Sequence, residues 1–530
     1  MNKILFCLAS ILLSGIQTIN AQTQELSIDQ RIDQWFGTVT KPIVDTVFYS
    51  INISGVGVPI VLIILLLGAL YFTIYFKFVN FRNFGTSINI IRGKYDDLEH
   101  GGSTELYEKS VSSVDGDNPD TIRIEGHDGE VSHFQALTAA LSGTVGLGNI
   151  AGVAVALSLG GPGATFWMIF AGLIGMASKF TECTLGVKYR EIAEDGTVYG
   201  GPMYYLSKGL EERGLGFIGK ILAVFFAIMC IGGSFGGGNM FQSNQAYQMF
   251  AKVTGITGSY GWIFGLIMAV LVGIVIIGGI KSIAKVTDKI VPFMVAVYVG
   301  SALILLGMNA SLIPKAIGTI LSGAFSAEGI TGGFIGVMIQ GFRRAAFSNE
   351  AGIGSASIAH SAVKTKYAAS EGLVALLEPF IDTVVVCTMT ALVIVITNFD
   401  GSIMTYGNEV PDGVVATSTA FSSVIPFFPY ILTMAVILFA FSTMISWSYY
   451  GYQAWSYLFG RSKIVEYVYK FMFCCFVVIG ASASLGSVIG FSDAMIFAML
   501  FPNMIGLFLL APVVKKEFNS YMEAINRMKK

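Results

Sequence analysis

Charged residues are scarce in this sequence. Lysine, arginine, aspartate and glutamate make up 12% of its 530 residues, which is about half the share found in soluble proteins. Hydrophobic residues make up 54%, and long apolar stretches recur along the whole length. A soluble fold would need a core far larger than single domains support. The composition therefore predicts a membrane protein that crosses the bilayer several times.

Patterns that mark other classes of protein are also absent. The six cysteines are scattered and form no disulfide framework, so we interpret them as small buried side chains. No basic stripe or zinc-binding spacing points to nucleic acid. The apolar segments hold no paired His/Glu motif, P-loop or nucleophile elbow, so neither an enzyme nor a bound cofactor is expected. No segment marks an obligate protein partner, and the lipid bilayer is the expected surrounding.

Residues 1–21 have the pattern of a signal peptide. A lysine precedes a short apolar run, and small and polar residues follow, with a cut expected near Ala21. An uncleaved anchor is the alternative. After cleavage the chain would begin outside the cytoplasm, with an amphipathic lead-in over residues 22–50.

Eleven membrane spans are predicted after this lead-in. A hydrocarbon core of about 30 Å needs roughly 20 apolar residues per helix. By that rule the spans lie near 51–76, 134–158, 163–188, 217–247, 259–280, 287–308, 330–360, 369–397, 425–449, 464–484 and 491–513. The first would be a peripheral helix, separated from the others by a cytoplasmic loop over 77–133. The acidic part of that loop, 95–131, has little apolar periodicity, and its role is open.

The placement of positive charge supports this count. Basic residues gather in the connections after odd-numbered spans and in the tail 514–530, whereas the outside connections hold little more than Lys252 and Lys315. This is the positive-inside pattern. It predicts an integral protein of the cell inner membrane, with the N-terminus outside after signal cleavage and the C-terminus in the cytoplasm.

Two of the predicted spans are interrupted at corresponding places. Gly143, Gly146 and Gly148 interrupt the second span, and "FSNEAGIG" from residue 347 interrupts the seventh. Such a pair points to a secondary transporter built from inverted repeats. The two five-span halves and the outside loop between them would cover 134–308, 330–513 and 309–329.

Interrupted helices have a use inside a membrane. Lipid cannot hydrogen-bond bare backbone, so unwinding is tolerated only where the backbone faces protein or a watery cavity. There the freed N–H groups can hold an anion and the freed carbonyls a cation, while glycine permits unusual dihedral angles. The pattern therefore suits a small zwitterion beside a small metal ion. Close packing between helices is the alternative explanation for the glycines.

Seven stretches together resemble one family. They are "SGTVGLGNIAGVAVA", "GGPGATFWM", "KFTECTLGVKYR", "YGGPMYYL", "GNMFQSNQ", "FRRAAFSNEAGIGSASIAHSA" and "FSTMISWSYYG". They resemble the alanine or glycine:cation symporter family, which is similar in fold to the leucine transporter. The resemblance covers nearly the whole chain from about residue 30. It implies an all-α integral membrane fold with a core of two inverted five-helix repeats and one extra N-terminal helix.

The resemblance also implies a substrate site. The substrate carboxylate would lie near the backbone N–H groups of the first break, where Asn149 would fix the break or contact the substrate. The ammonium group would face the second break. The implied substrate-binding residues are Thr144, Gly146, Gly148, Asn149, Gln242, Phe347, Ser348, Asn349, Gly352 and Ile353. For Gln242 the alternative is a place at a polar outer helix end.

A sodium site is implied beside it. The carbonyls of Ser142 and Val145 and the hydroxyls of Ser442 and Thr443 would hold the ion. A hard cation prefers oxygen ligands of this kind. The alternative is that the two hydroxyls bond their own helix backbone, as serine and threonine in membrane helices often do.

Ionisable residues inside membrane spans normally have partners. Lys179 and Glu182 are three residues apart on one helix, so we expect a local pair. The arginines before the second break have the carboxylates at 350, 378 and 382 as candidate partners. Candidate gate residues are Arg343, Glu350 and Trp447. The alternatives are static neutralisation and, for the tryptophan, an interfacial position.

The sequence thus predicts a sodium-coupled symporter that imports small neutral amino acids, alanine or glycine, by alternating access. Ion and substrate would bias the same conformational equilibrium. One alternative is a proton-coupled transporter of the same fold, although no titratable group is obvious near the cation site. The alternative from a different class is a membrane sensor of amino acids.

Overall fold

The computed structural model describes residues 28–53, 55–100, 131–194, 196–256, 260–325, 333–408, 413–424 and 427–528. The predicted signal peptide and most of the loop 95–131 lie outside these described residues.

A segment at one end of the bundle precedes the core helices. Helix α2 (Ile28–Val47) leads into an antiparallel hairpin of β1 (Ser50–Ile53) and β2 (Val56–Pro59). Helix α3 (Ile60–Tyr75) therefore begins later than the predicted span 51–76. It packs against α10 and α25. Three short helices follow at the other end of the bundle: α4 (Val79–Arg82), α5 (Phe84–Ile91) and α6 (Asp96–His100).

The first group of core helices begins with a capping box. The Ser132 hydroxyl accepts from the Gln135 N–H, and the Gln135 side chain accepts from the Ser132 N–H, which satisfies two free donors of the first helical turn. The group consists of α8 (His133–Thr144), η2 (Gly148–Gly152), α9 (Val153–Gly160), α10 (Ala164–Lys188), β3 (Glu191–Ile192), β4 (Val198–Tyr199), α11 (Pro202–Tyr204), η3 (Tyr205–Gly209), α12 (Gly216–Phe235), η4 (Gly236–Met240), α13 (Phe241–Thr254), α14 (Gly261–Ile276) and α15 (Gly279–Met308).

The second group contains the other break. Its helices are η5 (Ala310–Leu312), α16 (Ile313–Ala324), α17 (Gly333–Asn349), α18 (Ala356–His360), α19 (Ala368–Ala375), α20 (Leu377–Pro379), η6 (Phe380–Cys387), α21 (Thr388–Thr397), α22 (Gly413–Ser422), α23 (Phe428–Phe459), α24 (Lys463–Ser482) and α25 (Leu485–Met528). The tail predicted from residue 514 is therefore a continuation of α25.

Within the described residues, seven helical segments are long and apolar enough to cross a membrane, and the bent pair α8 with η2–α9 makes eight. The apolar helices α3 and α14 have only 16 residues each, fewer than the roughly 20 that a full crossing needs. Over the part of the chain that the structure describes, the architecture is thus helical apart from two small hairpins and one isolated bridge.

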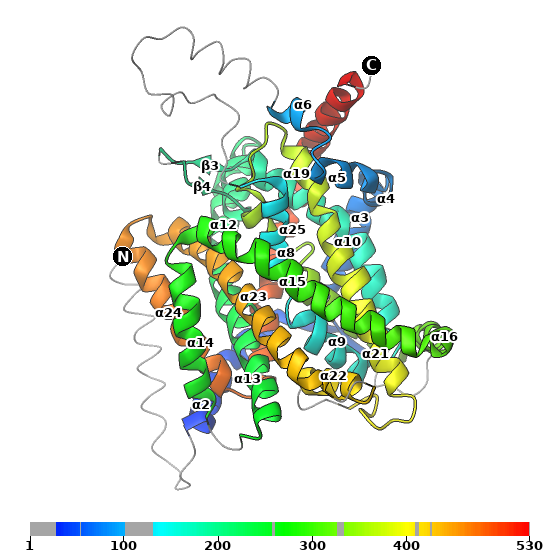
Figure 1. The fold of residues 1–530 in the computed structure, drawn as a ribbon. Helices are drawn as coiled ribbons and strands as arrows, with labels where there is room; N and C mark the ends of the chain where they lie inside the picture. The colour runs from blue at the N-terminus through cyan, green and yellow to red at the C-terminus, as the bar shows by residue number, and fades with distance from the viewer. Residues whose placement is uncertain are drawn as a thin grey trace.

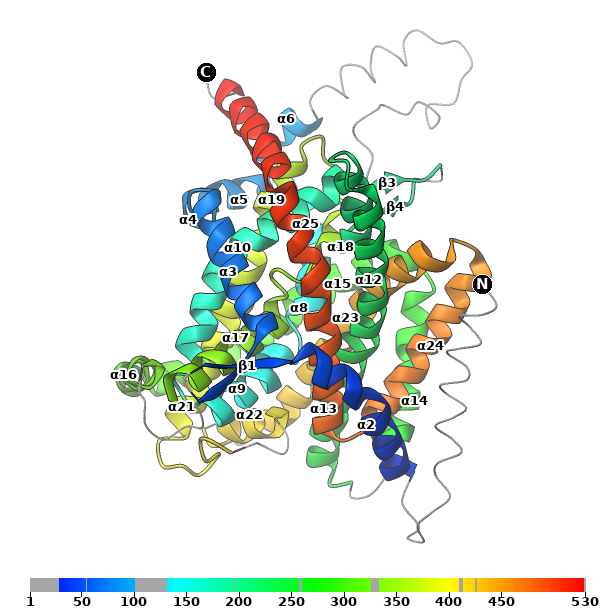
Figure 2. The same ribbon diagram turned by 180° about the vertical axis from the view of Figure 1, so that it is seen from behind.

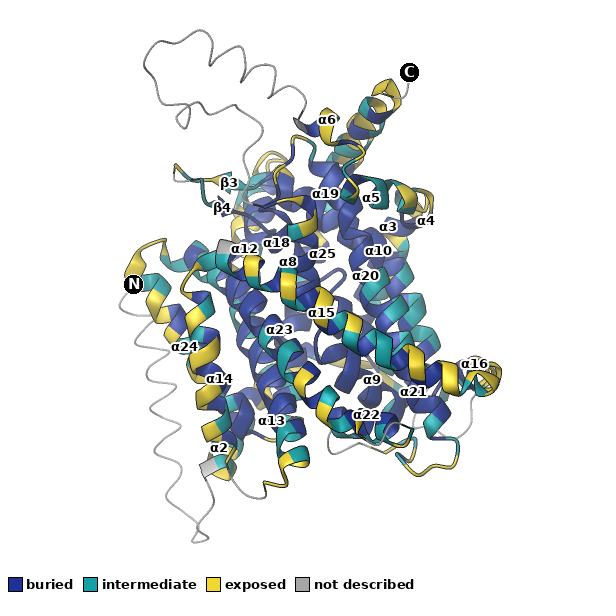
Figure 3. Ribbon diagram, viewed as in Figure 1, coloured by how far each residue is buried: buried dark blue, intermediate teal, exposed yellow. Residues whose placement is uncertain are grey.

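The helices form a bundle with a buried centre (Figures 1 and 2). Helix α12 packs against both α23 and α25, while α14 and α24 pair on one flank. The central helices are mostly buried, and the outer faces of α14, α24 and α15 carry exposed residues (Figure 3). Helix α6, the β3–β4 hairpin and the C-terminus lie at one end of the bundle, and α2 lies toward the other (Figure 1).

Candidate functional site

The first break separates α8 from η2. The two helical pieces meet at 51°, and residues 145–147 between them are not helical. Two side chains take the place of the lost helical bonds. The Gly146 N–H donates to Asn149 Oδ1 at 2.9 Å, and the Leu147 N–H donates to Gln242 Oε1 at 3.2 Å. Asn149 therefore fixes the break, which is one of the two roles expected for it.

Gln242 lies in the protein interior and is only 3% exposed. Its amide also donates to the Gly237 carbonyl at 2.9 Å. The alternative of a polar outer helix end is therefore wrong, because α13 turns this side chain toward the first break.

The second break follows Asn349. Three residues in this turn have a left-handed backbone: Glu350 (φ 56°), Gly352 (φ 88°) and Gly354 (φ 99°). A left-handed glutamate is uncommon, and here its side chain is held by the Ser355 hydroxyl and by Trp447. Asn349 Oδ1 accepts from the Ala351 N–H at 3.0 Å, which satisfies a backbone donor in the turn that follows α17.

The two breaks lie side by side in the bundle. Asp382, on the π-helical segment η6, accepts from the Asn149 amide at 2.6 Å and from the Ser348 hydroxyl at 2.8 Å. Trp447 on α23 bridges them a second time. Its indole N–H lies 3.2 Å from both the Gly143 carbonyl and Glu350 Oε1. One carboxylate and one indole thus connect the broken helices, and all of these groups are buried.

A closed cavity lies between the breaks. Its volume is about 10 Å³, close to the volume needed to hold a single water molecule. The residues that line it are Gly143, Thr144, Gly148, Gly237, Gln242, Phe347, Glu350, Trp447 and Ile496. Six predicted substrate residues do not line this cavity: Gly146, Asn149, Ser348, Asn349, Gly352 and Ile353. The Ile353 N–H donates to the Glu350 carbonyl.

The predicted sodium residues meet where α8 crosses α23. The Ser142 hydroxyl donates to the Ser442 carbonyl at 2.8 Å. The Ser442 hydroxyl donates to the Phe439 carbonyl of its own helix at 3.0 Å, as the alternative expected. Thr443 differs, because its Oγ1 is buried without a hydrogen-bond partner. A Cβ added at Gly146 would lie 2.5 Å from that oxygen, so Thr443 faces the first break directly.

Comparison with known proteins identifies the family. The model of the sodium:alanine symporter family matches residues 42–530. The chain belongs to this family. The sodium/alanine symporter AgcS of Methanococcus maripaludis is 43% identical over 75% of this chain and 86% of that protein. The probable sodium/glutamine symporter GlnT of Bacillus subtilis is 33% identical over 74% of this chain and 78% of that protein. The solved structure of MhsT in complex with L-phenylalanine aligns with 74% of this chain over 100% of its own chain, at 14% identity and a TM-score of 0.49.

Charged residues inside this symporter find partners on distant helices. Lys179 pairs with Glu378 at 3.0 Å, so the predicted local pair with Glu182 is wrong. Glu182 instead accepts from the Asn503 amide at 3.1 Å. Helix α20 brings Glu378 to the lysine, whereas the i, i+3 neighbour turns toward α25.

The arginines before the second break have a partner that sequence reasoning missed. Arg343 and Arg344 both bind Asp493 on α25, the former through Nε at 2.9 Å. The three candidate carboxylates named from the sequence are engaged elsewhere. A signal did exist, since Asp493 is an acidic residue within the predicted span 491–513 and such residues normally have a partner.

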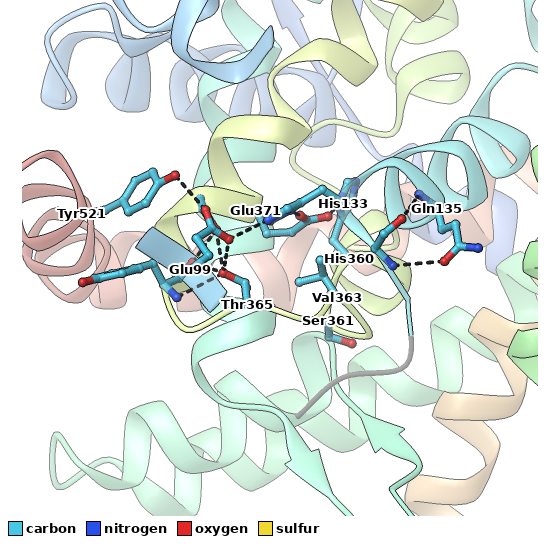
Figure 4. Close-up of polar contacts among 12 residues, drawn as sticks. Glu99, His133, Gln135, His360, Ser361, Val363, Thr365, Glu371 and Tyr521 are labelled. Carbon is cyan, nitrogen blue, oxygen red and sulfur yellow. Dashed lines mark hydrogen bonds and ion pairs between the residues drawn. The ribbon is translucent and has the colours of Figure 1, made fainter. Parts of the chain in front are cut away.

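A network of titratable groups lies at the end of the bundle near α6 (Figure 4). His133 Nε2 lies 2.7 Å from Glu99, and its Nδ1 contacts Glu371. Glu371 also lies 2.5 Å from His360. His360 in turn lies 3.5 Å from Glu378, the partner of Lys179. The network connects α6, α8, α18 and α19, and no spacing of these residues in the sequence indicates it.

Proposed function

We propose that this protein is a sodium-coupled symporter that imports alanine or glycine by alternating access. The core would consist of two inverted five-helix repeats, 134–308 and 330–513, with α3 as an extra N-terminal helix. Counting the 16-residue helices α3 and α14, and α17 with α18 as a second broken span, gives eleven crossings. The proposed orientation has the N-terminus outside the inner membrane after signal cleavage and the C-terminus in the cytoplasm. Family membership supports sodium coupling.

One observation carries the proposal for the substrate: two broken helices share a small buried cavity. In the proposed mode the substrate carboxylate lies against the first break and its ammonium group against the second. Gln242 would give up its bond to the Leu147 N–H as the carboxylate takes that donor. The cavity, with Phe347 and Trp447 on its wall, holds only about one water site, so it has to widen before an amino acid enters. The smallest side chains need the least widening, which favours alanine and glycine over larger amino acids.

The proposed sodium ligands are the carbonyls of Ser142 and Val145 and the hydroxyls of Ser442 and Thr443. The unbonded Oγ1 of Thr443 supports this proposal, because a buried hydroxyl without a partner is costly and a cation between α8 and α23 would satisfy it. Ser442 would have to release the Phe439 carbonyl or contribute only weakly.

Uptake of labelled alanine into proteoliposomes tests the proposal. We expect uptake to require an inward sodium gradient at clamped pH. Thr443→Val should raise the half-saturating sodium concentration by about tenfold, since one oxygen ligand worth roughly 1–2 kcal/mol is lost. Thr433→Val is the matched control on the same helix, because that hydroxyl bonds only its own backbone at 2.6 Å. Uptake of equal size without sodium would overturn sodium coupling.

Proton coupling is the second candidate, and the carboxylates at the breaks favour it. Glu350 lines the cavity and Asp382 contacts both broken helices. The titratable network from Glu99 to Lys179 extends toward them. A pH gradient imposed in sodium-free vesicles decides between the two ions. Concentrative uptake under that condition would make the proton the coupling ion, and its absence supports sodium.

A further inference from the structure

A second cavity lies away from both breaks. Its volume is about 320 Å³, and its wall is formed by α14, α15, α23, α24 and β4. Of the elements that line it, β4 belongs to the hairpin at one end of the bundle, and α14 and α24 lie on one flank (Figures 1 and 2). Three basic residues, Arg461, Lys463 and Lys470, line it.

Two of these cations share one carboxylate. Glu466 accepts from Lys463 at 3.1 Å and from Lys470 at 2.5 Å. Lys463 is 82% exposed and Lys470 only 10%. A single carboxylate neutralises one ammonium group, so one positive charge is left over on this side of the cavity.

Arg461 belongs to a second group of two cations and one carboxylate, which lies partly outside the cavity. Glu191 binds both Arg461, at 2.6 Å, and Lys208, at 3.0 Å. The Arg461 guanidinium also lies 3.7 Å from the centre of the Tyr199 ring, which holds it flat against the cavity wall. The lining itself holds three cations, Arg461, Lys463 and Lys470, and one carboxylate, Glu466. Glu191 and Lys208 beside it add one charge of each sign, so two positive charges remain in excess.

A buried acceptor completes the wall. Gln453 is 1% exposed, and its amide N–H donates to the Val198 carbonyl at 3.2 Å. Its Oε1 has no hydrogen-bond partner among the described residues. An unsatisfied buried acceptor is costly, and its place on the cavity wall calls for a ligand that donates a hydrogen bond, such as a hydroxyl group.

The outer surface beside the cavity is apolar. Ile277, directly after α14, is 60% exposed, and Phe471 on α24 is 72% exposed. Figure 3 shows exposed residues along both helices. Lys470 connects the cavity to this surface, because its ammonium group donates to the Ile277 carbonyl at 3.3 Å. In a membrane these side chains would contact acyl chains.

We propose that this cavity binds the headgroup of an anionic phospholipid whose headgroup carries hydroxyls, of the phosphatidylglycerol class. The phosphate lies between Arg461 and the two lysines, a glycerol hydroxyl donates to Gln453, and the acyl chains run along the apolar faces of α14 and α24. Basic cavities between membrane helices hold anionic headgroups in this way. The site does not depend on which ion or amino acid is transported.

Native mass spectrometry of the full chain in detergent tests the proposal. The probes are phosphatidylglycerol, phosphatidylcholine with the same acyl chains, and soluble glycerol phosphate. We expect phosphatidylglycerol to bind more tightly than phosphatidylcholine. Glycerol phosphate should compete poorly, because it lacks the acyl chains. Equal binding of the two lipids would overturn the proposal, and full competition by glycerol phosphate would assign the cavity to a soluble phosphate ester instead.

The decisive variant removes only the surplus charge. Arg461→Gln with Lys463→Gln leaves one cation for each carboxylate, and we expect phosphatidylglycerol binding to weaken on the order of 30-fold. The single variant Lys463→Gln, at an exposed position, should weaken it about fivefold and remains informative if the double variant does not fold. Lys515→Gln with Lys516→Gln is the control, with two charges removed from α25. Unchanged binding in the cavity variants, or an equal loss in the control, would overturn the assignment.

Discussion

A methyl group at Gly146 would test how the first break and the cation site are coupled. Gly146→Ala places its Cβ 2.5 Å from Thr443 Oγ1 and 3.3 Å from Gln242 Oε1. The first distance is far inside contact, so the threonine or the break has to move. Overpacking of this kind costs about 1 to 3 kcal/mol. We expect this cost to fall on the sodium-bound state, where the Thr443 hydroxyl is needed in place.

The expected result is a rise of roughly 5- to 150-fold in the half-saturating sodium concentration for alanine uptake. The assay is initial-rate uptake in proteoliposomes over a sodium series, with thermal unfolding in detergent as a check on folding. Gly152→Ala is the matched control, because a Cβ at that position of η2 meets nothing within 4 Å. Equal sodium dependence in the two variants, both folded, would refute the idea that Thr443 couples the break to the ion.

Two further substitutions probe the contacts between distant helices. Asp493→Asn leaves Arg343 and Arg344 without their carboxylate. We expect it to lower the free energy of unfolding by about 3 to 5 kcal/mol. A melting temperature equal to that of the unmodified protein would contradict this. Trp447→Phe removes the indole N–H that bridges Gly143 and Glu350. We expect alanine uptake to fall by about tenfold, and the free energy of unfolding to fall by about 1 to 3 kcal/mol because a buried acceptor loses its donor. Normal uptake by that variant would show that the bridge serves packing alone.

The charged partners show where reasoning from sequence stopped. Arg343 and Asp493 are 150 positions apart, and Lys179 and Glu378 are 199 apart. Helical periodicity reports only neighbours within a turn or two, so the sequence favoured the near pair with Glu182. A charged side chain buried in a helix bundle needs a partner of opposite charge. The packing of the helices determines which such partner lies within reach.

The hydroxyls of the proposed cation site show that the sequence also cannot distinguish between adjacent residues. Ser442 and Thr443 are adjacent in the sequence and were equal candidates as ligands. The structure separates them, because Ser442 turns to the Phe439 carbonyl while Thr443 is left without a partner. The residue types predict that a hydroxyl oxygen could bind the cation, but the rotation of α23 determines which hydroxyl faces the break.

By itself, the sequence determined that this chain is a membrane protein with two interrupted helices, and its motifs were enough to identify the family. Those features are local, because the apolar runs and the glycines and polar residues inside them occupy consecutive positions. Lipid offers no hydrogen bonds to the backbone, so such runs form helices and can be interrupted only where protein or water replaces the lipid. Only the tertiary structure decided that the two breaks adjoin through Asp382 and Trp447, that Gln242 caps the first break, and that surplus charge collects around a cavity beside α24. These facts depend on which helices pack together. Side-chain contacts between distant segments produce no periodic pattern in a single sequence, so they cannot be predicted from it.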